Sequence, residues 1–349
     1  MTHQGDASGY PYSVIVPVYN GSATIEACLH ALAHQSMSPD SYEIIVVDDG
    51  STDNTSQVVT AWRNRHPQIG CQQIHQSNTG PAAARNRGAQ IAQGRLLLFT
   101  DADCRPCATW IETFANVFAA DATISAAMGA YTSTQETPAA RFAQLEFEER
   151  YIGMATQATI DLVATYSAAF RRDVFLKETG FDPSFPKANN EDVEFSFRLS
   201  QQGYRMIFVP AATVTHPHVP TWWGYARTKF GRAFWRTVVY KRYPAKAVKD
   251  SYTPQILKLQ IILAPLCLLG LLWMIGQRTA TGLLLCVPFL LTTLPMVRFA
   301  LQHQPGVALW APWGLWLRSM VFALGVAWAL LTHQQTTQSA HHQVEDRSG

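Results

Sequence analysis

The chain has 349 residues, enough for one large domain and an additional segment. Its 48% hydrophobic content, 15% charged content and formal net charge of +2 average two unlike halves. No acidic residue occurs between Asp250 and Glu345, where the chain is rich in Leu, Trp, Pro and Gly. The six scattered cysteines fit a reducing compartment, and Cys104 and Cys107 have no second CxxC pair to complete a zinc site. We therefore expect a soluble half followed by a membrane-associated half.

Short β-rich runs alternate with helical patterns over the first hundred residues. The runs predict strands at residues 13–18, 43–48, 70–75 and 95–100, with helices at 22–35, 53–65 and 81–93. This alternation predicts a parallel sheet with helices on both faces, in which ligands bind beyond the carboxyl ends of the strands. The polar residues at these strand ends are Asn20, Asp48, Asp49, Asp101 and Asp103.

The alternation continues after residue 110. We predict a helix and a strand over 110–128, a helix at 137–153, a strand at 164–170, helices at 174–180 and 190–202, and a strand at 206–210. In the 137–153 helix, we expect the charged residues to lie on solvated faces; they are Arg141, Glu146, Glu148, Glu149 and Arg150. The Gln- and His-rich tail after Thr332 is expected to be disordered.

Asp101 and Asp103 directly follow the apolar run 96–99. Two carboxylates at positions i and i+2 of a turn can reach one Mg²⁺ or Mn²⁺ ion, which leaves coordination sites open for water and phosphates. Many turns contain the same pair and bind nothing. Attachment to a buried strand favours a metal site, because the strand holds the carboxylates in position. His216 is a further candidate ligand, although a lone histidine is usually not one.

Three other features have both a structural and a functional interpretation. Asp48 and Asp49 either belong to an ordinary loop or accept hydrogen bonds from a nucleobase or ribose. Arg85 follows a Gly-Pro turn at a helix start, either as a surface charge or as a phosphate ligand. Glu191 and Asp192 begin a helix, where the helix dipole alone favours acids; the alternative is a general base.

Five segments together resemble the inverting glycosyltransferases of family 2, which have the GT-A fold. In the family's order, they are SVIVPVYN (13–20), EIIVVDDGSTD (43–53), GPAAARNRG (80–88), FTDAD (99–103) and NEDVE (190–194). Each is modestly specific alone, and the match covers about residues 12–218. The resemblance implies an α/β fold, with a mostly parallel sheet flanked by helices.

The resemblance also implies roles for individual residues. Those facing a nucleotide-sugar donor are Pro17, Tyr19, Asn20, Asp48, Asp49, Arg85 and Asp101. Those near a divalent cation, Mg²⁺ or Mn²⁺, are Asp103 as the closer ligand, Asp101 on the ribose side, and His216.

The implied reaction is a single displacement at the anomeric carbon. Asp192 is the base that deprotonates the acceptor hydroxyl, and Glu191 contacts the acceptor or orients this base. The cation stabilises charge on the leaving diphosphate. One displacement inverts the configuration, so no enzyme nucleophile is needed.

Residues 221–254 form a basic segment, with eight Lys and Arg and no acid from Tyr225 to Lys249. Phe230, Phe234 and Val238 recur every four residues, which predicts an amphipathic helix. Such a helix suits an anionic membrane leaflet. A solvated basic helix is the alternative, and no nucleic-acid partner is expected because the adjacent apolar tract accounts for the charges.

The apolar tract at 255–332 contains uncharged stretches at 259–277, 279–297 and 299–317. A bilayer is spanned by about 20 helical residues, so we expect two to three transmembrane helices. Around Arg318, two arrangements remain open. One is an interfacial helix followed by a transmembrane span, and the other is one long span that contains the arginine.

The expected domains are a tail at 1–11, a catalytic domain at 12–220, the basic segment at 221–254, the transmembrane region at 255–332 and a tail at 333–349. The short polar N-terminus has no signal-peptide pattern. We therefore expect a multi-pass inner (plasma) membrane protein with a cytoplasmic catalytic domain.

The expected substrates are a nucleotide sugar, with UDP chosen by family frequency alone, and a glycan or lipid-linked acceptor of the cell envelope. Processive synthases of the family carry a Gln-x-x-Arg-Trp motif, whereas this chain has Gly231-Arg-Ala-Phe-Trp235. Transfer of one sugar is therefore favoured. A processive synthase with translocation and a non-catalytic nucleotide-sugar-binding scaffold are the alternatives.

Overall fold

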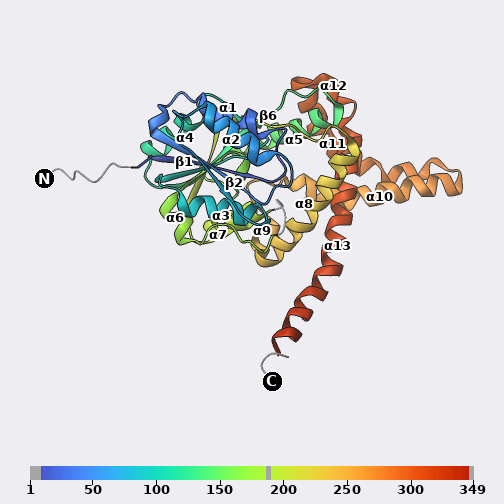
Figure 1. Cartoon of the computed structure of the whole chain (residues 1–349). Helices are drawn as coiled ribbons and strands as arrows, with labels where there is room; N and C mark the ends of the chain where they lie inside the picture. Colours follow the sequence, from blue (N-terminus) through green and yellow to red (C-terminus); the bar gives the residue numbers. More distant parts are fainter. Residues whose placement is uncertain (1–8, 186–189, 346–349) are drawn as a thin grey trace. The chain divides into compact units, whose positions relative to one another are not determined.

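The computed structural model describes residues 9–185 and 190–345, with side chains described up to Thr332. The chain divides into two compact units. Unit 1 contains Met1–Thr134 and Met154–Pro217, and unit 2 contains Gln135–Gly153 and His218–Gly349. Both are drawn in Figure 1.

In its described residues, unit 1 has one eight-stranded sheet of order β3-β2-β1-β4-β7-β6-β8-β5. The first four strands in this order are parallel: β1 (Tyr12–Val18), β2 (Tyr42–Asp48), β3 (Cys71–His75) and β4 (Leu96–Phe99). The helices that connect them are α1 (Ile25–Ala33), α2 (Thr55–Arg65) and α3 (Pro81–Ile91). This half of the sheet agrees with the alternation predicted from the sequence.

The second half of the sheet is mixed. Its strands are β5 (Arg105–Pro106), β6 (Ile124–Thr132), β7 (Ala168–Arg171) and β8 (Arg205–Thr215), and its helices are α4 (Trp110–Ala120), α6 (Arg172–Lys177) and α7 (Glu191–Gln201). The strand β7 is antiparallel to both β4 and β6, whereas β6 and β8 are parallel. Figure 1 shows α1, α2 and α4 over one face of the sheet and α3, α6 and α7 over the other. Short 3₁₀ turns lie at Pro39–Ser41 and Thr165–Ser167.

The strand β8 continues five residues beyond Pro210, where the sequence predicted its end. Its register against β6 shifts between Met128 and Ala130, whose partners are Phe208 and Thr213. Proline has no N–H for the ladder, and a bulge absorbs such a residue without ending the strand. The continuation places His216 immediately after the strand.

A cluster of five buried phenylalanines supports β4 just before the Asp101–Asp103 turn. Its members are Phe99, Phe170, Phe175, Phe181 and Phe195. The Phe99 ring lies 5.2 Å from Phe175 and 5.6 Å from Phe181 between centroids. Such pairs contribute about 0.5–1.5 kcal/mol each beyond their buried area. The strand end that carries the two carboxylates is therefore held rigidly.

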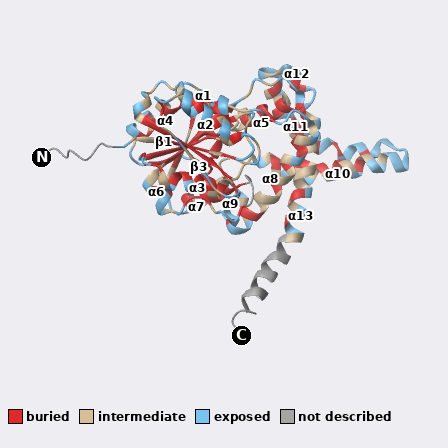
Figure 2. Cartoon of the chain, viewed as in Figure 1, coloured by how far each residue is buried: buried red, intermediate tan, exposed pale blue. Residues whose placement is uncertain are grey.

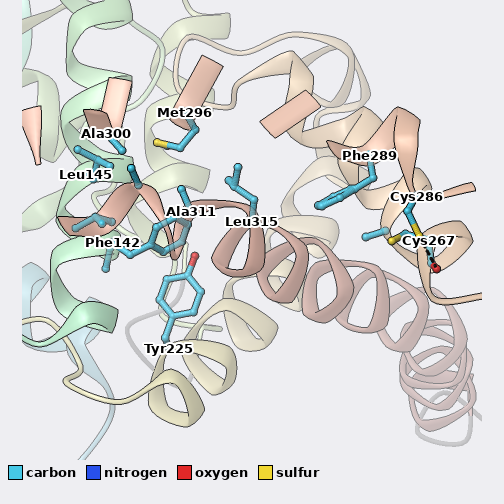
Figure 3. Close-up of a cluster of buried hydrophobic side chains, with 14 residues drawn as sticks. Phe142, Leu145, Tyr225, Cys267, Cys286, Phe289, Met296, Ala300, Ala311 and Leu315 are labelled. Carbon is cyan, nitrogen blue, oxygen red and sulfur yellow. Dashed lines mark hydrogen bonds between the residues drawn. The ribbon is translucent and has the colours of Figure 1, made fainter. Parts of the chain in front are cut away.

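Unit 2 is helical in its described residues. Its elements are α5 (Pro138–Ala155), α8 (Trp222–Arg242), α9 (Pro244–Val248), α10 (Gln255–Gln277), the 3₁₀ helix η3 (Ala280–Leu285), α11 (Val287–His303), α12 (Pro305–Ala308) and α13 (Ala311–Glu345). Its apolar core joins side chains of α5, α8, α10, α11 and α13 (Figure 3). Figure 2 shows that exposed residues predominate toward the C-terminal end of α10.

One expectation for α5 is wrong. Glu146 and Arg150 of α5 do not face solvent, since their side chains are 0% and 8% exposed. The reason is that α8 and α13 of the same unit bring Lys229 and Arg318 against Glu146. The backbone of α13 continues to Glu345, and the disorder expected after Thr332 stays a prediction, since no side chain is described there. No proline or glycine lies between Thr332 and Glu345 to stop the helix.

Two helices in the described chain are long and apolar enough to cross a membrane: α10 and the Ala311–Thr332 part of α13. The stretch 279–297 is not one helix, because η3 and α11 divide it. Around Arg318, the structure has a single continuous helix, so no break separates an interfacial helix from a following span.

Candidate active site

Asp101 and Asp103 lie in the turn that follows β4, at the carboxyl edge of the sheet. The backbone N–H of Cys104 donates to the Asp101 carbonyl at 3.0 Å and closes this turn. The Asp101 and Asp103 side chains are 30% and 41% exposed, so they remain open to a ligand. The predicted pair is therefore held by a rigid strand and accessible at its end.

Arg85 of α3 joins two distant carboxylates. Its Nη2 donates to Asp101 Oδ1 and its Nη1 to Glu191 Oε1, both at 2.7 Å. Arg85 is only 2% exposed, which rules out the interpretation as a surface charge. Because guanidinium–carboxylate hydrogen bonds are strong and directional, this bridge fixes α3, the β4 turn and the start of α7 relative to one another.

The first turn of α7 carries Glu191 and Asp192. Asn190 precedes it in the left-handed conformation, with φ of 69°. Asp192 is half-buried, and its Oδ1 and Oδ2 accept from the backbone N–H groups of Val193 at 2.8 Å and Thr165 at 3.4 Å. Burial raises the pKa of Glu191 to about 7, and the charge of Asp192 adds to the rise while Arg85 opposes it. The two adjacent acids therefore differ in environment.

His216 contacts Asp103 from the end of β8. Its Nε2 lies 3.3 Å from Asp103 Oδ2. Burial alone would raise the pKa of Asp103, but the hydrogen bond and charge of His216 outweigh it and hold that pKa below its usual range. The ligand atoms of Asp103, Cys104 and His216 all lie within 4.8 Å of one another. Carboxylate oxygens suit Mg²⁺ and Mn²⁺, and imidazole nitrogen suits divalent transition metals, so these residues fit a divalent cation.

Tyr131 packs against the His216 ring and Tyr166 supports Tyr131, and neither tyrosine was predicted from the sequence. Tyr131 of β6 lies 4.7 Å from His216 between ring centroids and stacks on Tyr166 at 3.4 Å. The neighbouring backbone helps, since the His216 N–H donates to the Thr132 carbonyl at 3.0 Å. The only local signal was an aromatic residue near a strand end, which does not identify its partner.

The loops after β1 and β2 are bound to each other. Asn20 Oδ1 accepts from the backbone N–H of Thr52 at 2.8 Å, and the Asn20 N–H donates to Ser51 Oγ at 2.9 Å. Asp48 is buried and accepts from the Ser51 N–H at 2.9 Å, while its Oδ2 lies 3.2 Å from His75 Nδ1. Asn20 and Asp48 thus shape this part of the sheet edge.

Asp49 organises the loop that leads into α3. Its carboxylate accepts from the backbone N–H groups of Thr79 at 2.9 Å and Gly80 at 2.8 Å. Gly50 has φ of 77°, and a Cβ there would lie 2.8 Å from the Asn78 nitrogen. Close approach of these two loops therefore requires the glycine. Nearby, Pro17 is half-buried and Tyr19 is 53% exposed at the end of β1.

The structure thus brings the predicted residues to one edge of the sheet. We call six of them the sheet-edge site: Arg85, Asp101, Asp103, Glu191, Asp192 and His216. Asn20, Asp48 and Asp49 lie in the neighbouring loops of the same edge, since β2, β1 and β4 are adjacent and parallel. The CxxC pair separates: Cys104 lies beside Asp103, whereas Cys107 Sγ is 3.9 Å from the Ala211 carbonyl.

Comparison with known proteins identifies glycosyltransferases as relatives of this chain. The family model described as Glycosyl transferase family group 2 matches residues 96–331, and that of Glycosyl transferase family 2 matches residues 13–178. Glycosyltransferase AglE of Haloferax volcanii is 26% identical over 213 residues, 60% of this chain and 67% of AglE. Validoxylamine A glucosyltransferase of Streptomyces hygroscopicus subsp. limoneus is 29% identical over 223 residues. That alignment covers 56% of this chain and 49% of the relative, so the chain spans about half of its length.

Among solved structures, a similar fold occurs in the mannosyltransferase PcManGT of Pyrobaculum calidifontis, in complex with GDP-Man and Mn²⁺. The TM-score is 0.57 at 23% sequence identity, over 92% of this chain and 88% of that one. The expected GT-A fold is thereby confirmed. With matching segments in the expected order and a family model that spans most of the chain, the protein belongs to glycosyl transferase family 2.

Proposed function

We propose that the protein is a metal-dependent, inverting glycosyltransferase that moves one sugar from a nucleotide-diphosphate donor to an acceptor hydroxyl. The observation that carries this proposal is the sheet-edge site. There, Arg85 bridges Asp101 to Glu191 beside a second pair, Asp103 and His216. Family membership and the fold support the same reaction class.

The donor binds along the carboxyl edge of the sheet in this proposal. Pro17, Tyr19 and Asn20 line the nucleotide pocket, and Asp48 or Asp49 contacts the base. The PcManGT complex contains GDP-Man, so GDP-mannose belongs beside UDP-sugars among the donors to test. Arg85, which Asp101 and Glu191 hold in position, faces the nucleotide in this proposal.

Asp103 and His216 hold a divalent cation, Mg²⁺ or Mn²⁺, with Asp101 on the ribose side. The bound cation supplies positive charge for the leaving diphosphate, as a Lewis acid does. The PcManGT complex also contains Mn²⁺, which supports a test of this metal first. The carboxylate exposure of 30–41% leaves room for the donor's own oxygens.

Asp192 accepts the proton of the acceptor hydroxyl. Its backbone hydrogen bonds fix the carboxylate at the start of α7. Glu191 does not share this role, because both its burial and its bond to Arg85 tie it to the interior. Glu191 is therefore a positioning residue for Arg85 and for the first turn of α7.

The test uses full-length protein in detergent, a panel of nucleotide sugars, and Mn²⁺ or Mg²⁺. Asp192→Asn should abolish sugar transfer while donor binding, measured by calorimetry, is retained. Glu194→Gln is the matched control, since Glu194 lies on the same helix and pairs with Arg198 at 3.2 Å instead. Transfer by Asp192→Asn at the normal rate would refute the base assignment.

The acceptor and the location are part of the proposal. We propose a lipid-linked or other envelope glycan acceptor and attachment to the inner membrane through unit 2, with the catalytic domain in the cytoplasm. The two apolar helices support membrane attachment. Products carrying one added sugar support this proposal, whereas long chains exported across the membrane would favour a processive synthase.

A further inference from the structure

We propose that α10 and α13 relate to the membrane in different ways, although both pass the same test of length and hydropathy. The helix α10 crosses the bilayer and the chain returns through η3 and α11, whereas α13 lies on the membrane surface beside α8. This inference rests on the membrane attachment proposed above. It predicts that Arg278 and Thr332 lie on opposite sides of the membrane.

The segment from α10 to α11 is an antiparallel hairpin. At its base, Gln260 Nε2 donates to the Thr292 carbonyl at 3.1 Å. Further along, the Cys286 thiol lies 3.5 Å from the Cys267 carbonyl (Figure 3). Residue numbers increase along α10, while the numbers of the residues that they contact decrease along the returning segment. The turn at Arg278 is therefore the tip of the hairpin.

Two glycines bring the backbones of the hairpin into direct contact near the tip. A Cβ on Gly270 would lie 2.3 Å from the Gly282 carbonyl oxygen, and one on Gly282 would lie 2.1 Å from that of Gly270. Small residues that permit such close approach are typical of helix pairs inside membranes. The hairpin is therefore one packed unit rather than two separate apolar segments.

The length and charges of the hairpin match a bilayer. The uncharged run from Leu259 to Gln277 is roughly 28 Å long as a helix, close to the hydrocarbon thickness of about 30 Å. The return from Thr279 to Val297 is also uncharged. The flanking charges are Lys258 and Arg298 at the base and Arg278 at the tip.

Large apolar side chains point outward around the hairpin, with nothing in the described chain to cover them. On α10 they include Leu266, Leu269, Leu272, Trp273 and Ile275, with exposures of 41–69%. On the return they include Leu284, Leu285, Leu290, Leu291 and Leu294, with exposures of 46–70%. In water, so large an apolar surface is unfavourable, whereas lipid chains cover it without loss.

The helix α13 contacts α10 near the base of the hairpin, where Trp316 Nε1 donates to the Ala264 carbonyl at 3.3 Å, but its longest contact is with α8, which lies along it. The contacts advance together along both helices. The Trp222 and Trp313 rings are 4.5 Å apart, Lys229 and Arg318 share Glu146, and Lys241 Nζ donates to the Ala329 carbonyl at 3.2 Å. The two helices are therefore parallel neighbours over nearly the whole of α8.

This pairing is incompatible with a transmembrane α13. If α13 crossed the bilayer, α8 would cross beside it and carry its basic side chains into the lipid, where charge is costly. Lys241 meets α13 at Ala329, near the end of the apolar stretch. Seven residues after the start of α13, Arg318 is bound to Glu146 of α5 and to Gln260 of α10, both at 2.6 Å.

A position on the membrane surface satisfies both helices. On α13, Leu324, Trp328 and Leu331 form one exposed apolar stripe with helical spacing, as interfacial helices do. The exposed basic residues of the neighbouring segment are Arg227, Arg232, Lys241, Arg242 and Lys249. Anionic lipid headgroups are complementary to this charge. The partner is therefore an anionic bilayer surface.

Cysteine labelling in a bacterial host tests this topology. The full-length chain first receives Cys71→Ser and Cys107→Ser, because the other four cysteines are buried. Single cysteines are then placed by Arg242→Cys, Arg278→Cys or Thr332→Cys. A membrane-impermeant maleimide is applied to spheroplasts before and after permeabilisation. We expect Arg242→Cys and Thr332→Cys to react from one side and Arg278→Cys only from the other.

Two results would overturn the inference. Labelling of Arg278→Cys from the same side as Arg242→Cys would show that the hairpin does not cross. Labelling of Thr332→Cys together with Arg278→Cys would show that α13 does. Release of the protein by alkaline carbonate would instead refute the membrane attachment, and sugar transfer by the same preparations is a separate readout of the proposed reaction.

Discussion

Each unit contains a group of ion pairs with buried members, and the two groups differ in how far their carboxylates are exposed to solvent. In unit 1, Arg85 is buried, but the Asp101 and Asp103 carboxylates at the sheet-edge site are 30% and 41% exposed. In unit 2, Glu146, Lys229 and Arg318 are 0%, 5% and 3% exposed. We call this second group the helical charge cluster. The first arrangement leaves ligand positions free, and the second is closed.

The sheet-edge site and the helical charge cluster also differ in their balance of positive and negative charge. At the sheet edge, one arginine serves two carboxylates and Asp192 adds a third, and the pKa of the buried Glu191 is raised to about 7. In the helical charge cluster, burial would raise the pKa of Glu146, but Lys229, Arg318 and Arg150 outweigh it and hold that pKa far below its usual range. An excess of carboxylates prepares a site for a cation, whereas an excess of cations around one carboxylate holds helices together.

The largest expected effect is on the stability of the helical charge cluster. Glu146→Ala leaves Lys229 and Arg318 buried without their shared partner, and breaking a buried pair in this way costs about 3–5 kcal/mol. The measurement is denaturant unfolding in detergent. Glu148→Ala is the control on the same helix, because Glu148 is only half-buried and bonds to Gln144. Equal effects of the two substitutions would mean that the cluster contributes nothing special.

The reverse pattern is expected at the sheet-edge site. Asp103→Asn should lower kcat/KM on the order of 100-fold, the usual effect of removing one group that stabilises developing charge. The unfolding free energy should change by no more than about 1 kcal/mol, the usual limit for a partly exposed ion pair such as Asp103 and His216. Activity assays and unfolding curves on the same preparation test this. A large loss of stability would remove the distinction between the two groups.

The raised pKa of Glu191 predicts a pH dependence of stability. In the folded state Glu191 keeps its proton up to about pH 7, whereas in the unfolded state it loses the proton near its ordinary pKa of 4.5. The folded state binds more protons between these values, so the free energy of unfolding falls as pH rises through this window. Glu191→Gln should make the curve flatter between about pH 5 and 7. A slope identical to that of the parent protein would contradict the buried environment of Glu191.

The smallest expected effect concerns the ring that holds His216. Tyr131→Leu removes the stack and should weaken Mn²⁺ binding about 10-fold, as loss of a residue behind a metal ligand does. Tyr131→Phe keeps the ring and should bind Mn²⁺ as the parent does. Free Mn²⁺ measured by electron paramagnetic resonance gives the affinity without any turnover. Equal weakening in both variants would assign the effect to the hydroxyl group rather than to the stack.

Much of the sheet-edge site and its neighbouring loops was predictable because the signals are local. Asp48, Asp49, Asp101 and Asp103 follow apolar strands, and the carboxyl ends of parallel strands meet at one edge. Glu191 and Asp192 begin a helix in both prediction and structure. Pairings were not predictable: Arg85 meets Glu191 across 106 positions of the chain, and His216 reaches Asp103 only because β8 continues past Pro210.

The sequence by itself determined the α/β class, the strands that carry the carboxylates and the apolar C-terminal tract, because periodicity and composition act over a few neighbouring residues. The tertiary structure alone decided that β7 runs antiparallel in the sheet, that Glu146 and Lys229 are buried, and that α10 pairs with its own return while α13 pairs with α8. The physical reason is that burial and pairing depend on which distant segment covers a side chain, and a residue's own neighbours do not specify that segment.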